Sequence, residues 1–367
     1  MIDDKKTLGE LLSDPRIGKI AADAIRNRDL SKEEVWNKTP AQLRDEHFFF
    51  GDIGRGFRRL FDAADTGDWY YPLYSEAECA EDAARRNVNM VWFPSDDPQA
   101  DERPFILLVP GGGFVNVWNL TEGWPVAAQF NSEGYHVFIL TYQTDGEERL
   151  LEKDLGDMAR ALRLIREKEK HFHLQADRYI TCGFSAGGML VCLWNTEMGY
   201  PAFHLAKPQA SFPIYPFVSL KLAAEDAPEE DAQEETEEDE REDIRLYGCP
   251  FTEAMEKPFE SPEHAEGFPP CAIFVMAGDE LLGHSKLLAD SLEKLHIPCR
   301  LEIGPEGGHG FADGTGTCIA GWTERAVRWY AEMSGMEGKH EGSAYEQSDS
   351  AGGSSWNGKD YQFIQAF

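Results

Sequence analysis

The sequence predicts an α/β protein with a doubly wound, mostly parallel sheet. Short apolar runs of strand length alternate with segments of helical periodicity, a pattern that favours layered α/β architecture. Residues 150–170 place Leu155, Met158 and Leu162 along one stripe, as expected of an amphipathic crossover helix. Right-handed crossovers between parallel strands then produce a doubly wound sheet. The candidate strands span residues 89–93, 105–109, 136–142, 179–183, 210–215, 272–277 and 300–303.

The length of 367 residues accommodates one large domain with appendages, and 42% hydrophobic residues permit a sizeable core. We predict a helical N-terminal extension over residues 1–65 and the main domain over 66–333. An acidic insertion over 223–245 interrupts the main domain. The tail over 334–367, rich in Gly and Ser, is expected to be flexible.

The N-terminal extension carries three helix-start signals, at Thr7, Ser31 and Thr39, each followed three residues later by Glu or Gln. Its aromatic side chains need a surface to bury against. We expect them to pack on the main domain, with a wall of the substrate pocket as the alternative role. The aromatic residues concerned are Trp36, Phe48, Phe49, Phe50, Phe57 and Phe61.

A glycine triplet, residues 111–113, follows the apolar run 105–109 directly. Consecutive glycines let backbone N–H groups approach a substrate oxygen closely, and the tetrahedral intermediate of acyl transfer needs two or three such donors. We predict that Gly112, Gly113 and the N–H of Ala186 form this oxyanion hole. The alternative is an ordinary flexible turn. The nearby aromatic rings either stack on a sugar or lie in the core; they belong to Phe114, Trp118 and Trp124. We take Phe114 and Trp118 as the candidate substrate-binding residues.

Ser185 is the candidate nucleophile. It lies in Gly183-Phe184-Ser185-Ala186-Gly187, between a strand-like run and an apolar helical run. Strand, G-x-S-x-G and helix form the context in which a sharp turn lifts a serine hydroxyl above a sheet. A glycine turn without catalytic meaning is the alternative for this motif taken alone.

His309 is the candidate base, because serine needs a neighbouring imidazole to take its proton. It lies on a glycine-rich loop between the strand 300–303 and a final helix around 323–333. The acid is expected after the strand 272–277, where Asp279 and Glu280 are adjacent. We favour Asp279 and keep Glu280 as the alternative. A carboxylate that caps the following helix is the structural explanation for either residue.

Together these motifs resemble the α/β-hydrolase superfamily, in particular its esterase branches related to acetyl-xylan esterases, feruloyl-esterase-like proteins and the hormone-sensitive-lipase group. The resemblance covers roughly residues 85–333. It implies about eight strands, a Ser-His-Asp triad that hydrolyses short acyl esters, acetyl esters especially, and no cofactor. Pro110 is a departure, because a histidine usually precedes the glycines in that family.

Two other functions stay open. Gly188, a second glycine after the serine motif, is also common in prolyl-oligopeptidase-like peptidases, although about 100 preceding residues are too few for their propeller. A catalytically silent hydrolase fold that binds a ligand is the second alternative. Three assays distinguish the esterase, the peptidase and the silent protein: hydrolysis of an acetylated sugar, cleavage of proline-containing peptides and labelling by a serine-directed probe.

The net charge of −31 disfavours nucleic acid and anionic membrane surfaces as partners. A small neutral ester is the expected substrate. The first residues lack the apolar core of a secretory signal, so we expect a cytoplasmic protein. Seven scattered cysteines without C-x-x-C pairs predict reduced thiols and no metal site. The acidic run 225–243 is either a mobile lid or a solvated loop.

Overall fold

The computed structural model describes residues 5–18, 20, 33–144, 146, 148–219, 222, 241, 245–247 and 265–335. The helix start predicted at Ser31, nearly all of the acidic run and residues 336–367 lie outside these ranges. The boundaries expected for the extension, the main domain and the tail stay a prediction.

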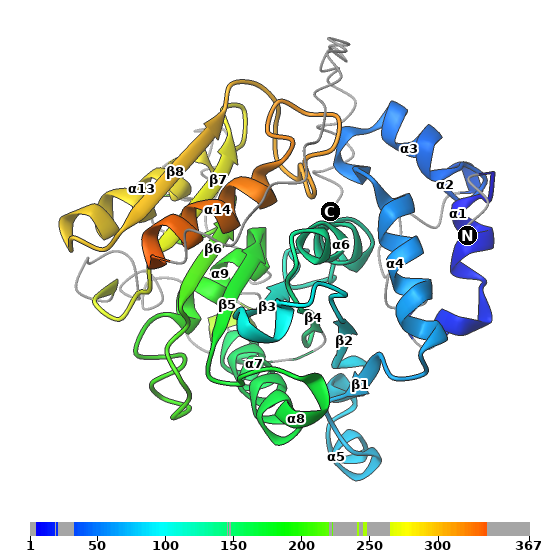
Figure 1. Ribbon diagram of the computed structural model, residues 1–367, viewed down its shortest axis with the longest axis horizontal. Helices are drawn as coiled ribbons and strands as arrows, with labels where there is room; N and C mark the ends of the chain where they lie inside the picture. Colours follow the sequence, from blue (N-terminus) through cyan, green and yellow to red (C-terminus); the bar gives the residue numbers. More distant parts are fainter. Residues whose placement is uncertain are drawn as a thin grey trace.

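One eight-stranded sheet organises the molecule, in the order β1-β2-β4-β3-β5-β6-β7-β8 (Figure 1). β2 is antiparallel to β1 and to β4, whereas the five other neighbouring pairs, from β4-β3 to β7-β8, are parallel. The predicted mostly parallel sheet is therefore confirmed. The strands are β1 (Tyr70–Pro72), β2 (Asn89–Phe93), β3 (Phe105–Val109), β4 (Val137–Thr141), β5 (Tyr179–Phe184), β6 (Ala210–Ile214), β7 (Cys271–Met276) and β8 (Cys299–Gly304).

Every predicted strand is present within two residues of its expected ends, but β1 was not predicted. Its three residues are too few to show the alternation that identifies a strand in sequence. It owes its conformation to antiparallel pairing with β2, in which Tyr71 lies opposite Met90.

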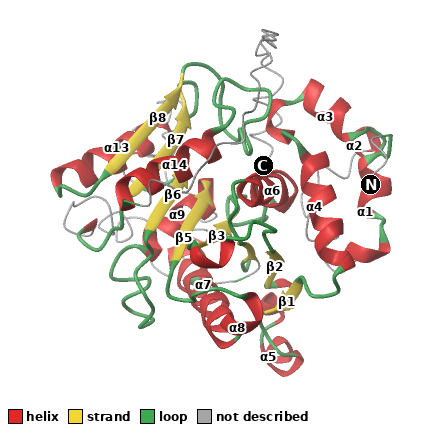
Figure 2. Ribbon diagram, in the orientation of Figure 1, coloured by secondary structure: helices red, strands yellow, loops and turns green. Residues whose placement is uncertain are grey.

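Helices cover both faces of the sheet (Figure 2). One face packs against α4 (Ile53–Asp65), α6 (Trp124–Ser132) and α14 (Trp322–Ser334), the other against α7 (Leu150–Glu167), α9 (Ser185–Trp194) and α13 (Leu282–Lys294). Alternate residues of each strand enter separate cores, so that Leu108 faces the first set of helices and Leu107 the second. The helix predicted over 150–170 is interrupted at Lys168, after which α8 (Glu169–Phe172) follows.

The N-terminal helices lie on one side of the molecule, where α4 packs against α6. They are α1 (Leu8–Leu12), α2 (Glu33–Trp36), α3 (Pro40–Glu46) and α4. Thr7 and Thr39 form the predicted capping boxes, each side chain accepting from the third backbone N–H of the helix that it precedes. Phe57 of α4 is fully buried, with its ring 5.4 Å from that of Trp124. The predicted packing of the extension on the main domain is present.

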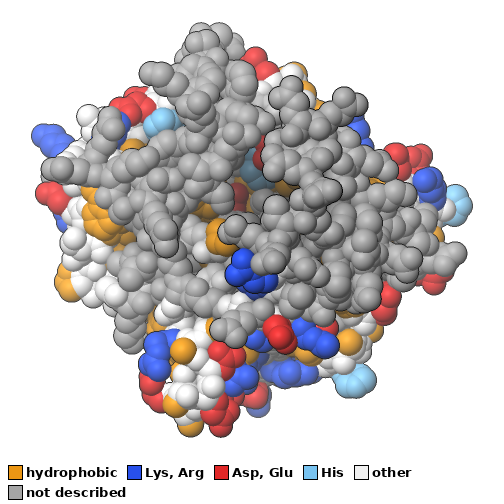
Figure 3. Space-filling model, turned by 180° about the vertical axis from the view of Figure 1, so that it is seen from behind, with side chains coloured by type: hydrophobic (Ala, Val, Ile, Leu, Met, Phe, Trp, Pro, Cys, Tyr) orange, Lys and Arg blue, Asp and Glu red, His pale blue; other side chains and the backbone are white. Residues whose placement is uncertain are grey.

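Charged side chains of both signs lie intermixed along the lower edge of the molecule, near α5 (Glu76–Glu81) and α8 (Figure 3). Arg160 of α7 pairs there with Glu78 at 2.7 Å. Within the described part of the chain, no helix has both the length and the apolar character needed to cross a bilayer.

Candidate active site

Ser185 lies at the sharp turn between β5 and α9. Its φ of 49° is left-handed, a conformation that costs free energy in a residue with a side chain and that clusters at functional sites. A Cβ atom at Gly187 would lie 2.2 Å from the carbonyl oxygen of Val109, so the turn requires glycine there. The hydroxyl therefore stands at the carboxyl edge of the sheet, where ligands of such folds bind.

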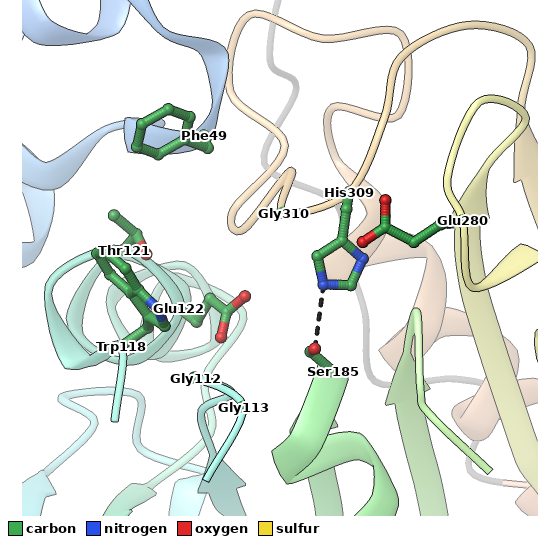
Figure 4. Close-up of a pocket in the computed structure, with 10 residues that line it drawn as sticks. All are labelled: Phe49, Gly112, Gly113, Trp118, Thr121, Glu122, Ser185, Glu280, His309 and Gly310. Atoms are coloured by element: carbon green, nitrogen blue, oxygen red, sulfur yellow. Dashed lines mark hydrogen bonds between the residues drawn. The ribbon is translucent and has the colours of Figure 1, made fainter. Parts of the chain in front are cut away.

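His309 lies between Ser185 and Asp279. Its Nε2 is 3.0 Å from the Ser185 Oγ. A dashed line in Figure 4 marks this hydrogen bond. Its Nδ1 is 3.0 and 3.1 Å from the two carboxylate oxygens of Asp279. Asp279 rather than Glu280 thus carries the contact, while Glu280 lines the cavity beside the imidazole ring (Figure 4).

The loops after β7 and β8 hold the acid and the histidine together. The N–H of Gly278 donates to the carbonyl of Gly307 at 2.9 Å, which ties the two loops side by side. Asp279 is oriented by its own loop, because it accepts a 2.8 Å hydrogen bond from the N–H of Leu281. Its side chain is completely buried, whereas the His309 side chain keeps 14% exposure toward the cavity.

Electrostatics favour the protonated form of His309. Burial by itself lowers the pKa of the imidazole, but the charge and hydrogen bond of Asp279 outweigh that effect and raise the pKa to about 9. More distant Glu280 and Glu122 act in the same direction. The surroundings therefore stabilise an imidazolium ion, which is the species formed when histidine takes a proton from serine.

The glycine triplet lies opposite Ser185. Gly112 and Gly113 line the cavity and have φ values of 133° and 59°. The N–H of Gly111 is already engaged, because it donates to the Glu122 carboxyl group at 2.6 Å. Gly112, Gly113 and Ala186, the residue that follows the serine, stay the predicted donors for a substrate oxygen. The carbonyl of the unusual Pro110 accepts from the Tyr142 hydroxyl at 3.0 Å.

A cavity of about 200 Å³ opens above Ser185. We name its two sides by their residues, which Figure 4 shows facing each other across the opening. The triad wall consists of Ser185, Glu280, His309 and Gly310. The aromatic wall consists of Phe49, Trp118, Thr121 and Glu122.

Two of the three aromatic side chains considered for sugar stacking lie elsewhere. Trp118 lines the cavity, but the expectation for Phe114 is wrong. With a φ of 61°, Phe114 turns into the core on the α7 and α9 side, where it is 5% exposed and its ring lies 6.3 Å from Tyr142. Trp124 is buried against Phe57. Burial of these large rings favours the core over the cavity surface.

Three residues at the site were not predicted there or were given another role. Phe49 of the extension lines the cavity, so the extension both packs on the main domain and contributes to the aromatic wall. Glu122 and Tyr215 are buried beside the glycine loop and the histidine. A signal for Glu122 exists in the sequence, since it is a lone acid between Leu120 and the apolar start of α6.

The family described as alpha/beta hydrolase fold matches residues 106–313. The chain is 28% identical over 133 residues to an acetylxylan esterase of Xylanibacter ruminicola, a match that covers 36% of this chain and 26% of that protein. It is 26% identical over 227 residues to endo-1,4-beta-xylanase B of Butyrivibrio fibrisolvens, covering 60% of this chain and 34% of that protein. The matches thus span about a quarter to a third of the length of these relatives.

Among solved structures, the chain resembles an acetyl ester-xyloside bifunctional hydrolase of Caldicellulosiruptor lactoaceticus, with a TM-score of 0.54 and 24% identity over 72% of this chain and 96% of that one. It also resembles a carboxylesterase of Lactobacillus plantarum, with a TM-score of 0.54 and 20% identity over 69% and 94% of the two chains. At these identities the likeness shows a shared fold.

Proposed function

The chain belongs to the α/β-hydrolase fold family, and from this premise we propose that it is a serine hydrolase that cleaves carboxylic esters of short acyl groups. The observation that carries the proposal is the continuous series of contacts from Asp279 through His309 to Ser185, with both nitrogens of the imidazole engaged at 3.0 Å. Nucleophile, base and orienting acid within this reach are the signature of an activated serine.

In the first half of the reaction, the Ser185 Oγ attacks the ester carbonyl carbon while His309 Nε2 takes the hydroxyl proton. Asp279 holds the Nδ1 proton, keeps the imidazole in the required tautomer and stabilises its positive charge. The carbonyl oxygen becomes negative and is bound by N–H groups of Gly112, Gly113 and Ala186. As the intermediate collapses, the C–O bond to the alcohol breaks, and His309 returns its proton to the leaving oxygen.

In the second half, water replaces the alcohol. His309 takes a proton from the water as its oxygen attacks the acyl carbon on Ser185, and the same N–H groups bind the second oxyanion. The bond to Ser185 Oγ then breaks, the serine recovers its proton from His309, and the carboxylic acid leaves. No step of this reaction requires a cofactor.

The substrate class we propose is an acetylated carbohydrate. A cavity of about 200 Å³ is below the range of roughly 300–1,000 Å³ typical of sites for drug-sized ligands, which favours a small acyl group. Trp118 offers an aromatic face at the cavity, and such faces suit a sugar ring. The partial identity to an acetylxylan esterase points to the same substrate class.

The test is hydrolysis of p-nitrophenyl acetate, butyrate and octanoate by the purified protein and by S185A. We expect turnover to be highest for acetate and to fall with chain length. Loss of the nucleophile is expected to lower kcat by about 10⁶-fold, as in other serine hydrolases. Full turnover by S185A would rule out the assigned nucleophile.

Two further measurements separate this proposal from its alternatives. Acetate release from an acetylated xylooligosaccharide, without cleavage of proline-containing peptides, is expected for the esterase. Peptide cleavage without deacetylation would identify a peptidase instead. A fluorophosphonate probe should label Ser185 in the folded protein, and absence of labelling would favour a silent binding protein.

A further inference from the structure

Glu122 has no role in the reaction described above, yet it lies at the centre of the site. It belongs to a π-helical turn (Asn119–Gly123), is 5% exposed, and lines the same cavity as Ser185. A buried carboxyl group is costly unless its oxygens are hydrogen bonded. Its partners therefore indicate what it contributes.

Both oxygens of the Glu122 carboxyl group have a donor. Oε2 accepts from the Gly111 N–H at 2.6 Å, and Oε1 accepts from the Tyr215 hydroxyl at 2.7 Å. Both distances are at or below the usual values for their types. Burial raises the pKa of Glu122, and the two hydrogen bonds oppose that rise.

On the first side, Glu122 acts on the glycine loop. A Cβ atom at Gly111 would lie 2.7 Å from the carbonyl oxygen of Phe184 and 2.9 Å from both Ser185 Cβ and Glu122 Oε2. The loop therefore passes between the nucleophile and the carboxyl group with no spare room. The bond from the Gly111 N–H to Glu122 determines where the next two glycines lie relative to Ser185.

On the second side, Glu122 acts on the histidine loop through Tyr215, the residue after β6. The Tyr215 ring packs edge-on against His309, with ring centroids 4.6 Å apart. Its hydroxyl also accepts from the N–H of Ala312, at 3.3 Å. Tyr215 has a φ of 36°, a strained conformation that persists only where the surroundings hold it.

We propose that Glu122 is a positioning residue: its two hydrogen bonds join the glycine loop to the tyrosine that supports His309. A single carboxyl group then fixes the positions of the oxyanion donors and of the base, which lie on opposite sides of Ser185. The effect on turnover rests on the proposed esterase function, whereas the effect on loop order does not.

The test compares E122A with E122Q. Alanine removes both hydrogen bonds. Glutamine keeps the shape, because its carbonyl accepts from the Gly111 N–H and its amide N–H donates to the Tyr215 oxygen. For p-nitrophenyl acetate we expect E122A to lower kcat by about 10²-fold with KM changed less than about threefold, since oxyanion donors act in the transition state. E122Q should stay within about tenfold of the unsubstituted protein.

Hydrogen exchange of the backbone over residues 105–118 provides a readout that does not depend on activity. We expect faster exchange in E122A and exchange close to the unsubstituted protein in E122Q. If the unsubstituted protein hydrolyses no ester but E122A loosens the loop, the proposed function fails and the positioning role stands. If the unsubstituted protein is active and E122A matches it in kcat and exchange, or E122Q is as impaired as E122A, the positioning role is overturned.

Y215F keeps the inference testable if E122A does not fold. It removes the hydroxyl group but leaves the ring against His309 and the Gly111 bond to Glu122. We expect kcat to fall by about three- to tenfold with KM unchanged. An unchanged kcat in Y215F would contradict the link between Glu122 and the histidine side.

Discussion

The two walls of the cavity differ in origin and in chemistry. The triad wall comes from residues that follow three parallel strands, β5, β7 and β8, whose carboxyl ends share one edge of the sheet. The aromatic wall comes from the turn before α6 and from Phe49 of the N-terminal extension. The triad wall holds His309, which is paired with Asp279 buried behind the wall. The aromatic wall holds two aromatic rings and a buried carboxyl group.

This difference implies a division of labour. Changes at Ser185, His309 or Asp279 should lower turnover of every ester, because they remove groups that meet the reacting atoms or the acid that orients the base. Changes at the rings of the aromatic wall, Phe49 and Trp118, should alter which ester is preferred, because they reshape the space for the acyl group. Glu122 of the same wall is the exception, because its hydrogen bonds hold the glycine loop and Tyr215. Five measurements test this division and the contacts on which it rests, from the largest expected effect to the smallest.

The largest effect is expected from D279N, with E280Q at the adjacent residue as the control. An amide at Asp279 favours the wrong imidazole tautomer, so kcat should fall by about 10⁴-fold. E280Q should lower kcat by less than about tenfold, because its carboxyl group does not carry the contact with Nδ1. Steady-state kinetics with p-nitrophenyl acetate measures both variants. A severe loss in E280Q with near-normal D279N would exchange the two roles.

The next effect concerns pH. His309 takes the serine proton only in its neutral form, and its pKa is raised from 6.5 to about 9. We expect kcat/KM to rise with pH through an apparent pKa above 6.5, by up to about 10²-fold between pH 6.5 and 9. D279N should move this apparent pKa downward, because Asp279 contributes more than any other group to raising it. Glu280 and Glu122, which also raise the pKa, are still present in that variant. A profile with a midpoint below 6.5 in the unsubstituted protein would contradict the pairing.

The same raised pKa affects stability. A histidine that is easier to protonate in the folded state stabilises the fold fully below about pH 6.5, and this contribution is lost as pH rises through about 9. Urea unfolding measures the free energy of unfolding at pH 6 and at pH 9. The decrease from pH 6 to pH 9 should be larger in the unsubstituted protein than in D279N. Equal losses would indicate that the pair does not stabilise the fold.

A smaller effect is expected at Phe49 in the aromatic wall. F49A should enlarge the acyl space and raise the ratio of kcat/KM for hexanoate over acetate by about tenfold, the scale of discrimination from one or two methylene contacts. F48A is the matched control, since Phe48 is the neighbouring ring but not a residue of the cavity lining. The division between the walls would be refuted if F49A lowered kcat for all esters equally.

The smallest effect on turnover is expected at Asp313, which joins the extension to the histidine loop. Its buried carboxylate accepts from the Asp52 N–H at 3.2 Å and from the Thr315 hydroxyl at 2.8 Å. D313N replaces one acceptor oxygen by a donor, so the free energy of unfolding should fall by about 1–3 kcal/mol. The hexanoate-to-acetate ratio should change by less than threefold. An unaltered urea midpoint would show that this contact does not hold the extension.

Local patterns predicted much of the fold. Six of the eight strands, β2 to β7, are buried along their whole length, and a strand buried on both faces needs a nearly continuous apolar sequence that can be recognised. β8 was also predicted, although its apolar residues alternate with Arg300 and Glu302. The three-residue β1 did not follow, since it depends on pairing with β2, and the interruption at Lys168 was not predicted either. The predicted site residues Ser185 and His309 lie in glycine-rich turns after strands, and a turn of that kind has a sequence signature.

Through-space relations required the tertiary structure. The sequence determined that two adjacent carboxylates follow β7, but only the pairing of the β7 and β8 loops decides that Asp279 contacts the imidazole. The sequence places aromatic residues on both sides of the glycine loop, yet packing decides that Phe114 enters the core while Phe49 reaches the cavity. Glu122 meets Tyr215 across 93 positions of the chain. Periodicity and turn chemistry act over a few residues, whereas contacts between distant segments exist only once the sheet and its helices have packed.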